Sequence, residues 1–127
     1  MSITITGEFY SSKNSQTIIQ RPNGGRFIMK NKNADREQKE FQWQLKQDAV
    51  IKEWERMKQG KEYPLRVQFK LYRRTRRAFD FINAIQNFCD AMTKEGYWPD
   101  DDCYHVIPVF VPHELDANNP RCDVTIL

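Results

Sequence analysis

The chain has 127 residues, of which 39% are hydrophobic and 29% charged, and its formal net charge is +3. This length suits one domain over residues 1–127 and is too short for two. An aromatic content of 13% excludes a disordered chain, and no apolar run reaches the roughly 20 residues of a membrane span. The N-terminus lacks the order of a signal peptide, and the three cysteines form no C-x-x-C pair, so we expect a cytoplasmic protein.

The first thirty residues predict a strand and a hairpin. Residues 2–9 alternate apolar and polar side chains, as a half-buried strand does. The runs 16–21 and 26–29 flank Pro-Asn-Gly-Gly, a turn sequence whose Asn and Gly tolerate positive φ. We therefore expect these runs to be the two arms of a hairpin, followed by a polar loop.

A single long helix is predicted next, from Asn33 or Asp35 as the N-cap to Gly60. Apolar residues recur every three to five positions and form one stripe, consisting of Phe41, Leu45, Ala49 or Val50, Trp54 and Met57. Trp43 lies off this stripe. We interpret it as a second packing contact rather than a ligand or DNA contact.

Residues 65–72 give the clearest strand pattern, with apolar side chains at the odd positions and polar or basic ones between them. A second helix is predicted from Asp80 to Gly96. Its apolar face consists of Phe81, Ile82, Ile85, Phe88, Cys89 and Met92. Its polar face consists of Asp80, Asn83, Asn87, Asp90 and Lys94, with Gln86 at the border.

The last third of the chain predicts two more strands. Residues 103–111 read as a strand in which Pro108 marks an edge or a bulge, and residues 121–127 form a closing strand after a polar loop. The order predicts an α+β fold with two main helices packed on a small mixed or antiparallel sheet.

Charge is unevenly distributed around the second helix. Four arginines, at positions 73, 74, 76 and 77, precede Asp80, and three aspartates follow the helix at positions 100–102. One interpretation is local charge compensation, with Asp80 as an N-cap and the other acids solvated. The other is a site where the arginines hold phosphates and the carboxylates bind Mg²⁺ or Mn²⁺. Asp80 and Asp90 would lie about 15 Å apart on the helix, but a return strand could bring an acid of the turn beside Asp80.

A family resemblance favours the second interpretation. The stretch in question, residues 73–102, reads RRTRRAFDFINAIQNFCDAMTKEGYWPDDD. It resembles the signature of the RusA family of Holliday-junction resolvases, in which an Arg-rich loop leads into D-x-D-N at a helix start. A Lys follows three residues after the Asn, then a D-A-L or D-A-M step, and the helix ends in G-x-W/I-x-D-D. Asp80 and Asn83 match the first Asp and the Asn, and residues 90–101 match the second half without a gap.

This resemblance implies a small homodimer of phage or prophage type that binds four-way DNA junctions and cuts them with Mg²⁺ or Mn²⁺. It implies catalytic roles for Asp80, Asp90 and Asp101. The implied metal ligands are Asp80, Asn83, Asp100 and Asp101. The implied DNA contacts are Arg73, Arg74, Arg76, Arg77 and Lys94. Candidate dimer surfaces are Trp43, the long first helix and residues 104–110.

The chain departs from the signature at two positions. Ile82 stands where the family has the second Asp of D-x-D-N, and Gln86 stands where it has the Lys. An alternative is therefore a catalytically impaired module of the same fold that binds branched DNA without cutting it. A third reading is a structural or partner-binding domain whose arginines form a solvated loop.

Overall fold

The computed structural model describes residues 1–10, 16–20, 26–30 and 32–127. In these residues the chain forms three helices and seven strands. Their bounds are β1 Ile3–Thr6, β2 Gln16–Gln20, β3 Arg26–Lys30, α1 Lys32–Leu45, α2 Asp48–Lys58, β4 Leu65–Arg73, α3 Phe81–Lys94, β5 Val106–Phe110, β6 Glu114–Leu115 and β7 Arg121–Ile126. The fold is α+β, as the sequence predicts.

Within the described residues, five strands form one mixed sheet in which β4 pairs with β7, β5 and β6. β1 and β4 are antiparallel to β7, whereas β5 and β6 are parallel to β4. The alternation predicted for residues 65–72 is confirmed, since the apolar side chains of β4 from Leu65 to Leu71 are at most 2% exposed. β5 lies at an edge of the sheet, which explains how Pro108 is accommodated without an amide hydrogen.

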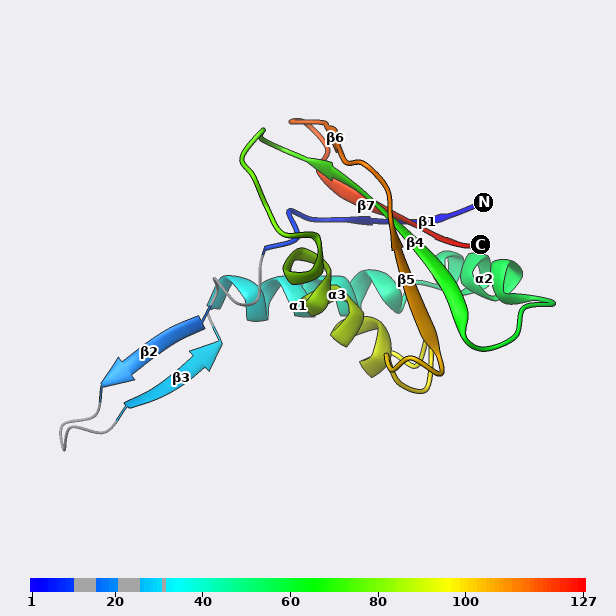
Figure 1. Ribbon diagram of the computed structural model, residues 1–127, viewed down its shortest axis with the longest axis horizontal. Helices are drawn as coiled ribbons and strands as arrows, with labels where there is room; N and C mark the ends of the chain where they lie inside the picture. The colour runs from blue at the N-terminus through cyan, green and yellow to red at the C-terminus, as the bar shows by residue number, and fades with distance from the viewer. Residues whose placement is uncertain (11–15, 21–25, 31) are drawn as a thin grey trace.

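The parallel pair β4–β5 requires a crossover, because a hairpin can join only antiparallel strands. The crossover contains α3, which follows the segment 74–80 and precedes the segment 95–105 that leads into β5. Figure 1 shows α3 below the strands with α1 beside it, and the two helices are in contact. The arginine-rich and acid-rich segments therefore flank the same helix.

The prediction of a single long helix between residues 33 and 60 is wrong, because the chain forms two helices, α1 and α2, with a break at residues 46 and 47. Gln47 has an extended backbone (φ −70°, ψ 134°), and its Nε2 donates to the main-chain oxygen of Trp43 at 2.9 Å. This hydrogen bond satisfies a main-chain carbonyl in the last turn of α1, where the carbonyls have no amide partner within the helix. No helix in the described part of the chain is long and apolar enough to cross a membrane.

Trp43 does not make the packing contact that the sequence predicts. Its side chain is 61% exposed, whereas those of Phe41 and Leu45 on either side are at most 1% exposed. Successive helical residues point about 100° apart, so a residue midway between two core positions faces outward. Trp43 therefore adds nothing to the core of the single chain.

An aromatic cluster fills the space between the helices and the sheet. Phe88 of α3 has three ring neighbours, Phe9, Phe41 and Phe69, at centroid distances of 5.4, 5.2 and 6.2 Å. All four side chains are at most 1% exposed. They come from the segment after β1, from α1, from α3 and from β4, so this cluster joins most layers of the fold.

The predicted strand ends differ from those observed where the backbone turns. The strand predicted over residues 2–9 ends at Thr6, because Gly7 and Phe9 adopt positive φ angles of 151° and 58°. A Cβ at Gly7 would lie 2.9 Å from the Cε1 atom of Phe41, so glycine is required there. The hairpin β2–β3 is confirmed by its antiparallel register, from Gln16 opposite Lys30 onward, while its tight-turn residues 22–25 lie outside the described residues.

The helix predicted from Asp80 is confirmed as α3, but two side chains lie on the unexpected side. Ile82, placed on the apolar face by the sequence, is 69% exposed. Asn87, placed on the polar face, is fully buried where α1 crosses α3. Its Nδ2 donates to the main-chain oxygen of Ala34 at 3.0 Å, and its Oδ1 accepts from Gln38 Nε2 at 2.9 Å. A polar residue is tolerated in this contact because both of its polar atoms are hydrogen-bonded.

Candidate nucleic-acid and metal site

Asp80 is the N-cap of α3. Its backbone is extended (φ −100°, ψ 119°), and its Oδ1 accepts from the amide of Ile82 at 3.0 Å. Its Oδ2 accepts from Asn83 Nδ2 at 3.3 Å. The sequence pattern Asp-x-x-Asn thus places two of the predicted metal ligands in direct contact. The same bonds satisfy an amide at the helix start, so Asp80 has a structural role whatever else it does.

Arg73 is bound to the protein's own backbone. Its Nη1 donates to the main-chain oxygens of Glu8 at 2.8 Å and Phe9 at 3.2 Å. Its guanidinium lies 4.3 Å from the centre of the Phe79 ring. Burial lowers the pKa of Arg73 from its ordinary value. These contacts make Arg73 a residue that fastens the end of β4 to the segment after β1.

The other three arginines are exposed. Arg74 Nε bonds to Glu8 Oε1 at 2.7 Å. Arg76 and Arg77 form no ion pair with any residue that the structure describes. Of the four arginines predicted to bind DNA, Arg76 and Arg77 are therefore the two that are exposed and have no ion-pair partner among the described residues.

A buried carboxylate holds the segment that Arg73 also binds. Glu37 of α1 is 8% exposed, and its two oxygens accept from the amides of Phe9 at 3.0 Å and Tyr10 at 2.9 Å. The positive φ of Phe9 turns these successive amides toward one point, as in an anion-binding nest. Burial raises the pKa of Glu37 to about 7. Residues 8–10 are thus clamped by Glu37 through their amides and by Arg73 through their carbonyls.

Glu37 belongs to none of the motifs in the sequence, although a signal for it exists. Glu37 lies four residues before Phe41, in line with the apolar stripe of α1. A charged side chain on such a stripe must find buried partners. The partners are main-chain amides in a non-repetitive segment, and no pattern of side chains reveals those.

Replacing Glu37 with glutamine is expected to change the pH dependence of stability. The folded-state pKa of about 7 lies above the ordinary value of 4.5, so the folded state binds the proton more tightly. The contribution of Glu37 to stability is full below pH 4.5 and is lost as pH rises through about 7, by up to about 3 kcal/mol. Urea unfolding at about pH 5 and about pH 8 should show wild-type stability falling relative to Glu37→Gln. A difference that does not vary with pH would contradict this expectation.

Aromatic side chains hold the turn that carries the three consecutive aspartates. Trp98 Nε1 donates to Thr93 Oγ1 at 2.7 Å, and Trp54 Nε1 donates to the main-chain oxygen of Tyr97 at 3.3 Å. The Tyr97 hydroxyl donates to the main-chain oxygen of Leu45 at 2.6 Å. Residues 97 and 98 are therefore fixed against all three helices, immediately before the acidic turn.

The turn brings Asp101 near Asp90. The pKa of Asp101 is raised, first by partial burial and then by the charges of Asp90 and Asp100. Burial raises the pKa of the neighbouring Cys89 thiol to about 12, and the charges of Asp101 and Asp90 add to this effect. Asp102 lies 2.7 Å from His105 Nδ1, whereas Asp90, Asp100 and Asp101 form no ion pair with a described residue. Their mutual repulsion is thus uncompensated by any protein cation in the part of the chain that the structure describes.

The predicted metal ligands fall into two places. Asp80 and Asn83 lie at the start of α3, and Asp90 is ten residues later, about 15 Å along the helix axis. Asp100 and Asp101 lie with Asp90. Among the described residues, no three Asp, Glu, His or Cys side chains converge closely enough to hold a metal ion. Joint ligation by all the predicted residues stays a prediction.

Lys94, predicted to contact DNA, has a partner within the protein. Its Nζ donates to Gln38 Oε1 at 2.7 Å, and Gln38 in turn contacts Asn87. This chain of hydrogen bonds crosses the contact between α1 and α3. A DNA contact by Lys94 stays a prediction, and its observed bond stabilises the helix pair.

The crossover helix, its exposed arginines and its group of acids define a candidate phosphate-binding site with hard oxygen ligands. The family model described as endodeoxyribonuclease RusA matches residues 11–127. The chain therefore belongs to the RusA family, whose members act on Holliday junctions in branched DNA. The resemblance seen in residues 73–102 is thereby confirmed. No curated protein matches the chain.

Proposed function

We propose that this protein is a metal-dependent endodeoxyribonuclease that binds and cleaves Holliday junctions during DNA recombination and repair. One observation carries the proposal beyond family membership. Asp90, Asp100 and Asp101 lie together on the crossover whose other side presents Arg76 and Arg77 to solvent. A nuclease needs cations to hold the DNA backbone and a separate acidic group to activate water, and this crossover carries both.

The acidic group offers the carboxylate oxygens that Mg²⁺ and Mn²⁺ prefer, and its carboxylates would have to draw closer together to hold an ion, since no three described ligand side chains converge on one point. Burial raises the pKa of Asp101 first, and the charges of Asp90 and Asp100, which a bound cation would neutralise, raise it further. The family signature also implies Asp80 and Asn83 as ligands, but they lie about 15 Å along α3 from Asp90 and are not part of this acidic group. When bound, the ion would polarise the phosphate and lower the pKa of a water molecule.

The chain's own groups have distinct tasks in this proposal. Arg76 and Arg77 bind phosphate oxygens, for which the planar guanidinium is suited because it donates two parallel hydrogen bonds. The Asp101 carboxylate accepts a hydrogen bond from the attacking water and orients it toward the phosphorus. The bond from Trp98 to Thr93 anchors the chain three residues before Asp101 to α3, which limits the reorganisation of the backbone when DNA binds.

We also propose that the protein acts as a homodimer. A four-way junction is nearly two-fold symmetric, and closed two-fold dimers are the commonest oligomers. Exposed apolar side chains offer candidate contact surfaces: Trp43 on α1 is 61% exposed, Tyr104 before β5 is 76% exposed and Ile107 in β5 is 42% exposed. Two copies would place two cutting sites on one junction.

The experiment that tests the proposal is cleavage of a labelled mobile four-way junction by the purified protein in Mg²⁺, in Mn²⁺ and in chelator. We expect paired cuts at symmetric positions with either metal and intact DNA in chelator. Linear duplex of the same composition is the control substrate. Absence of cleavage with both metals, or equal cleavage of junction and linear duplex, would reject the proposal.

A second candidate function is binding of branched DNA without cleavage. The observation that favours it is the position of Ile82, whose side chain is 69% exposed where the family signature has a carboxylate. Gln86, one turn later, is also exposed and stands where the signature has a lysine. An exposed isoleucine can supply neither a metal ligand nor a charge.

The double substitution Ile82→Asp with Gln86→Lys separates the two functions. Both side chains are exposed, so we expect the variant to fold like the wild type. If the wild type binds without cutting, the variant should gain metal-dependent cleavage of the four-way junction. If the wild type already cuts, the cleavage rate of the variant should differ from that of the wild type by less than about tenfold, since the wild-type site works without these groups. If the variant binds the junction but does not cut it, the loss of cleavage is not explained by the absence of these two side chains alone.

A further inference from the structure

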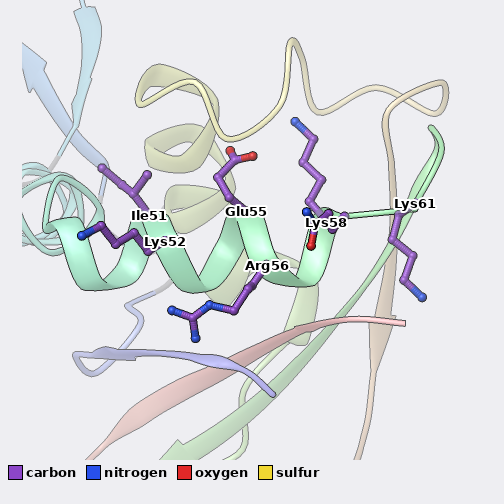
Figure 2. A pocket seen from close by; sticks show the side chains of 7 residues that line it. Ile51, Lys52, Glu55, Arg56, Lys58 and Lys61 are labelled. Atoms are coloured by element: carbon purple, nitrogen blue, oxygen red, sulfur yellow. The ribbon is translucent and has the colours of Figure 1, made fainter.

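A basic groove runs along the outer side of α2, outside the site described above. It has a volume of about 640 Å³ and lies open to solvent. Seven residues line it: Ile51, Lys52, Glu55, Arg56, Lys58, Gln59 and Lys61. Figure 2 shows these side chains spreading from α2, with Lys52 toward one end of the helix and Lys61 beyond the other.

The groove carries four cations and one carboxylate, Glu55. Arg56 is paired with Glu53 at 2.7 Å, but no described carboxylate pairs with Lys52, Lys58 or Lys61. The helix dipole accounts for basic residues in the last turn, which are Arg56 and Lys58. It does not account for Lys52, which lies in the middle of the helix. The surplus of positive charge therefore exceeds what stabilising α2 requires.

The groove lies next to the acidic turn through a short series of contacts. Lys58 Nζ is 5.5 Å from the centre of the Tyr63 ring, and the Tyr63 ring is 5.3 Å from that of His105. His105 Nδ1 is 2.7 Å from Asp102 Oδ1. On its buried side, α2 also holds the turn through Trp54. Helix α2 and the acidic turn thus form one packed unit.

The cations are spread around α2 as well as along it. Lys52 and Lys58 are about 9 Å apart along the helix axis but point about 120° apart around it, so they do not form one row on a single face. Contact with both therefore requires a polyanion as broad as a DNA duplex, whose two strands together carry a phosphate about every 1.7 Å along the axis. The groove is also shallow and solvent-open, which suits a backbone lying across it better than an enclosed small molecule.

We propose that this groove binds the sugar-phosphate backbone of a DNA duplex arm that extends away from the acidic turn. The proposal rests on the proposed function, because it assumes that DNA reaches the acidic turn. The contacts are electrostatic and independent of sequence. The groove then adds a second binding region to the one formed by Arg76 and Arg77, which lie at the other end of α3.

The test compares the wild type with the groove variant Lys58→Gln/Lys61→Gln and with the control variant Lys39→Gln/Lys46→Gln. The control removes the same charge from α1 and from the break that follows it, where Lys39 and Lys46 are both exposed. Affinity for a four-way junction is measured in chelator at several salt concentrations. We expect the groove variant to bind about tenfold more weakly at moderate salt. The slope of the logarithm of its affinity against the logarithm of salt concentration should become shallower by about two, because two phosphate contacts are lost. The variant Glu55→Gln should bind more tightly than the wild type.

The outcomes separate this inference from the proposed function. If the wild type shows no salt-dependent binding of the junction, the proposed function fails and the groove proposal fails with it. If the wild type binds but the groove and control variants have the same affinity and salt slope, only the groove proposal is overturned. Unfolding midpoints equal to that of the wild type show that the variants are folded, so a specific loss in the groove variant supports the proposal.

Discussion

Replacing Asp101 with asparagine is expected to slow cleavage of a four-way junction on the order of a thousandfold, which corresponds to a loss of several kcal/mol of transition-state stabilisation. In the proposed function the Asp101 carboxylate, which lies with Asp90 and Asp100, accepts a hydrogen bond from the attacking water. Asparagine keeps the shape of the side chain and removes its charge. The measurement is the single-turnover rate with saturating protein in Mg²⁺ and in Mn²⁺.

Junction binding separates a chemical role from a structural one. Asp101→Asn should bind the junction at least as tightly as the wild type in chelator, because it removes a negative charge near DNA. Asp35→Asn on α1, whose carboxylate forms an exposed ion pair with Lys39, is the matched control and should cut normally. Equal cutting by Asp101→Asn and the wild type would remove Asp101 from the mechanism.

Replacing Phe88 with alanine is expected to lower the free energy of unfolding by about 3–5 kcal/mol. Phe88 is fully buried and lies against three other phenylalanine rings, so truncation leaves a cavity where the helices and the sheet meet. For a domain of this size, whose total stability is about 5–15 kcal/mol, that loss is severe. Urea unfolding followed by circular dichroism measures it directly.

Ile82→Ala on the same helix is the control for this prediction. The Ile82 side chain is 69% exposed, so its truncation should change the free energy of unfolding by no more than about 0.5 kcal/mol. The sequence pattern alone places Ile82 and Phe88 on the same apolar face of α3 and would predict a substantial cost for both. Comparable losses in the two variants would contradict the observed orientation of α3.

Side-chain periodicity predicts a helix or strand when one of its faces is buried against the core along the whole element. β4 is such an element, because its alternating side chains are uniformly buried on one side. The β2–β3 hairpin and the start of α3 at Asp80 are also predictable, since the residues that turn or cap the chain are local. The two-residue strand β6 is not predictable in this way, because it is too short to show a period.

Features created by contact between distant elements are not predictable from periodicity. Asn87 is buried because α1 crosses α3 at that point and supplies Gln38 and a main-chain carbonyl. Glu37 is buried because the segment after β1 turns its amides toward it. The break at residues 46 and 47 leaves a weak trace, a five-residue step between Leu45 and Val50, where a continuous stripe would step by three or four.

The candidate site was predictable as a set of residues and not as an arrangement. The motif in residues 73–102 indicates the acids and arginines as candidates, and the family match supports the family assignment that the motif suggests. The motif does not reveal that Arg73 binds main-chain oxygens while Arg76 and Arg77 remain exposed. That difference depends on where the segment after β1 lies, and this segment is more than sixty residues away in the chain.

The crossover helix α3 fixes the distance between the residues at its two ends. Fourteen residues of α3 extend about 21 Å, and about 15 Å separates its cap at Asp80 from Asp90. Along one DNA strand, 15 Å corresponds to roughly four nucleotides. In the proposed function, the number of nucleotides between a phosphate held by the arginines and the bond that is cut is therefore set by a count of helical turns.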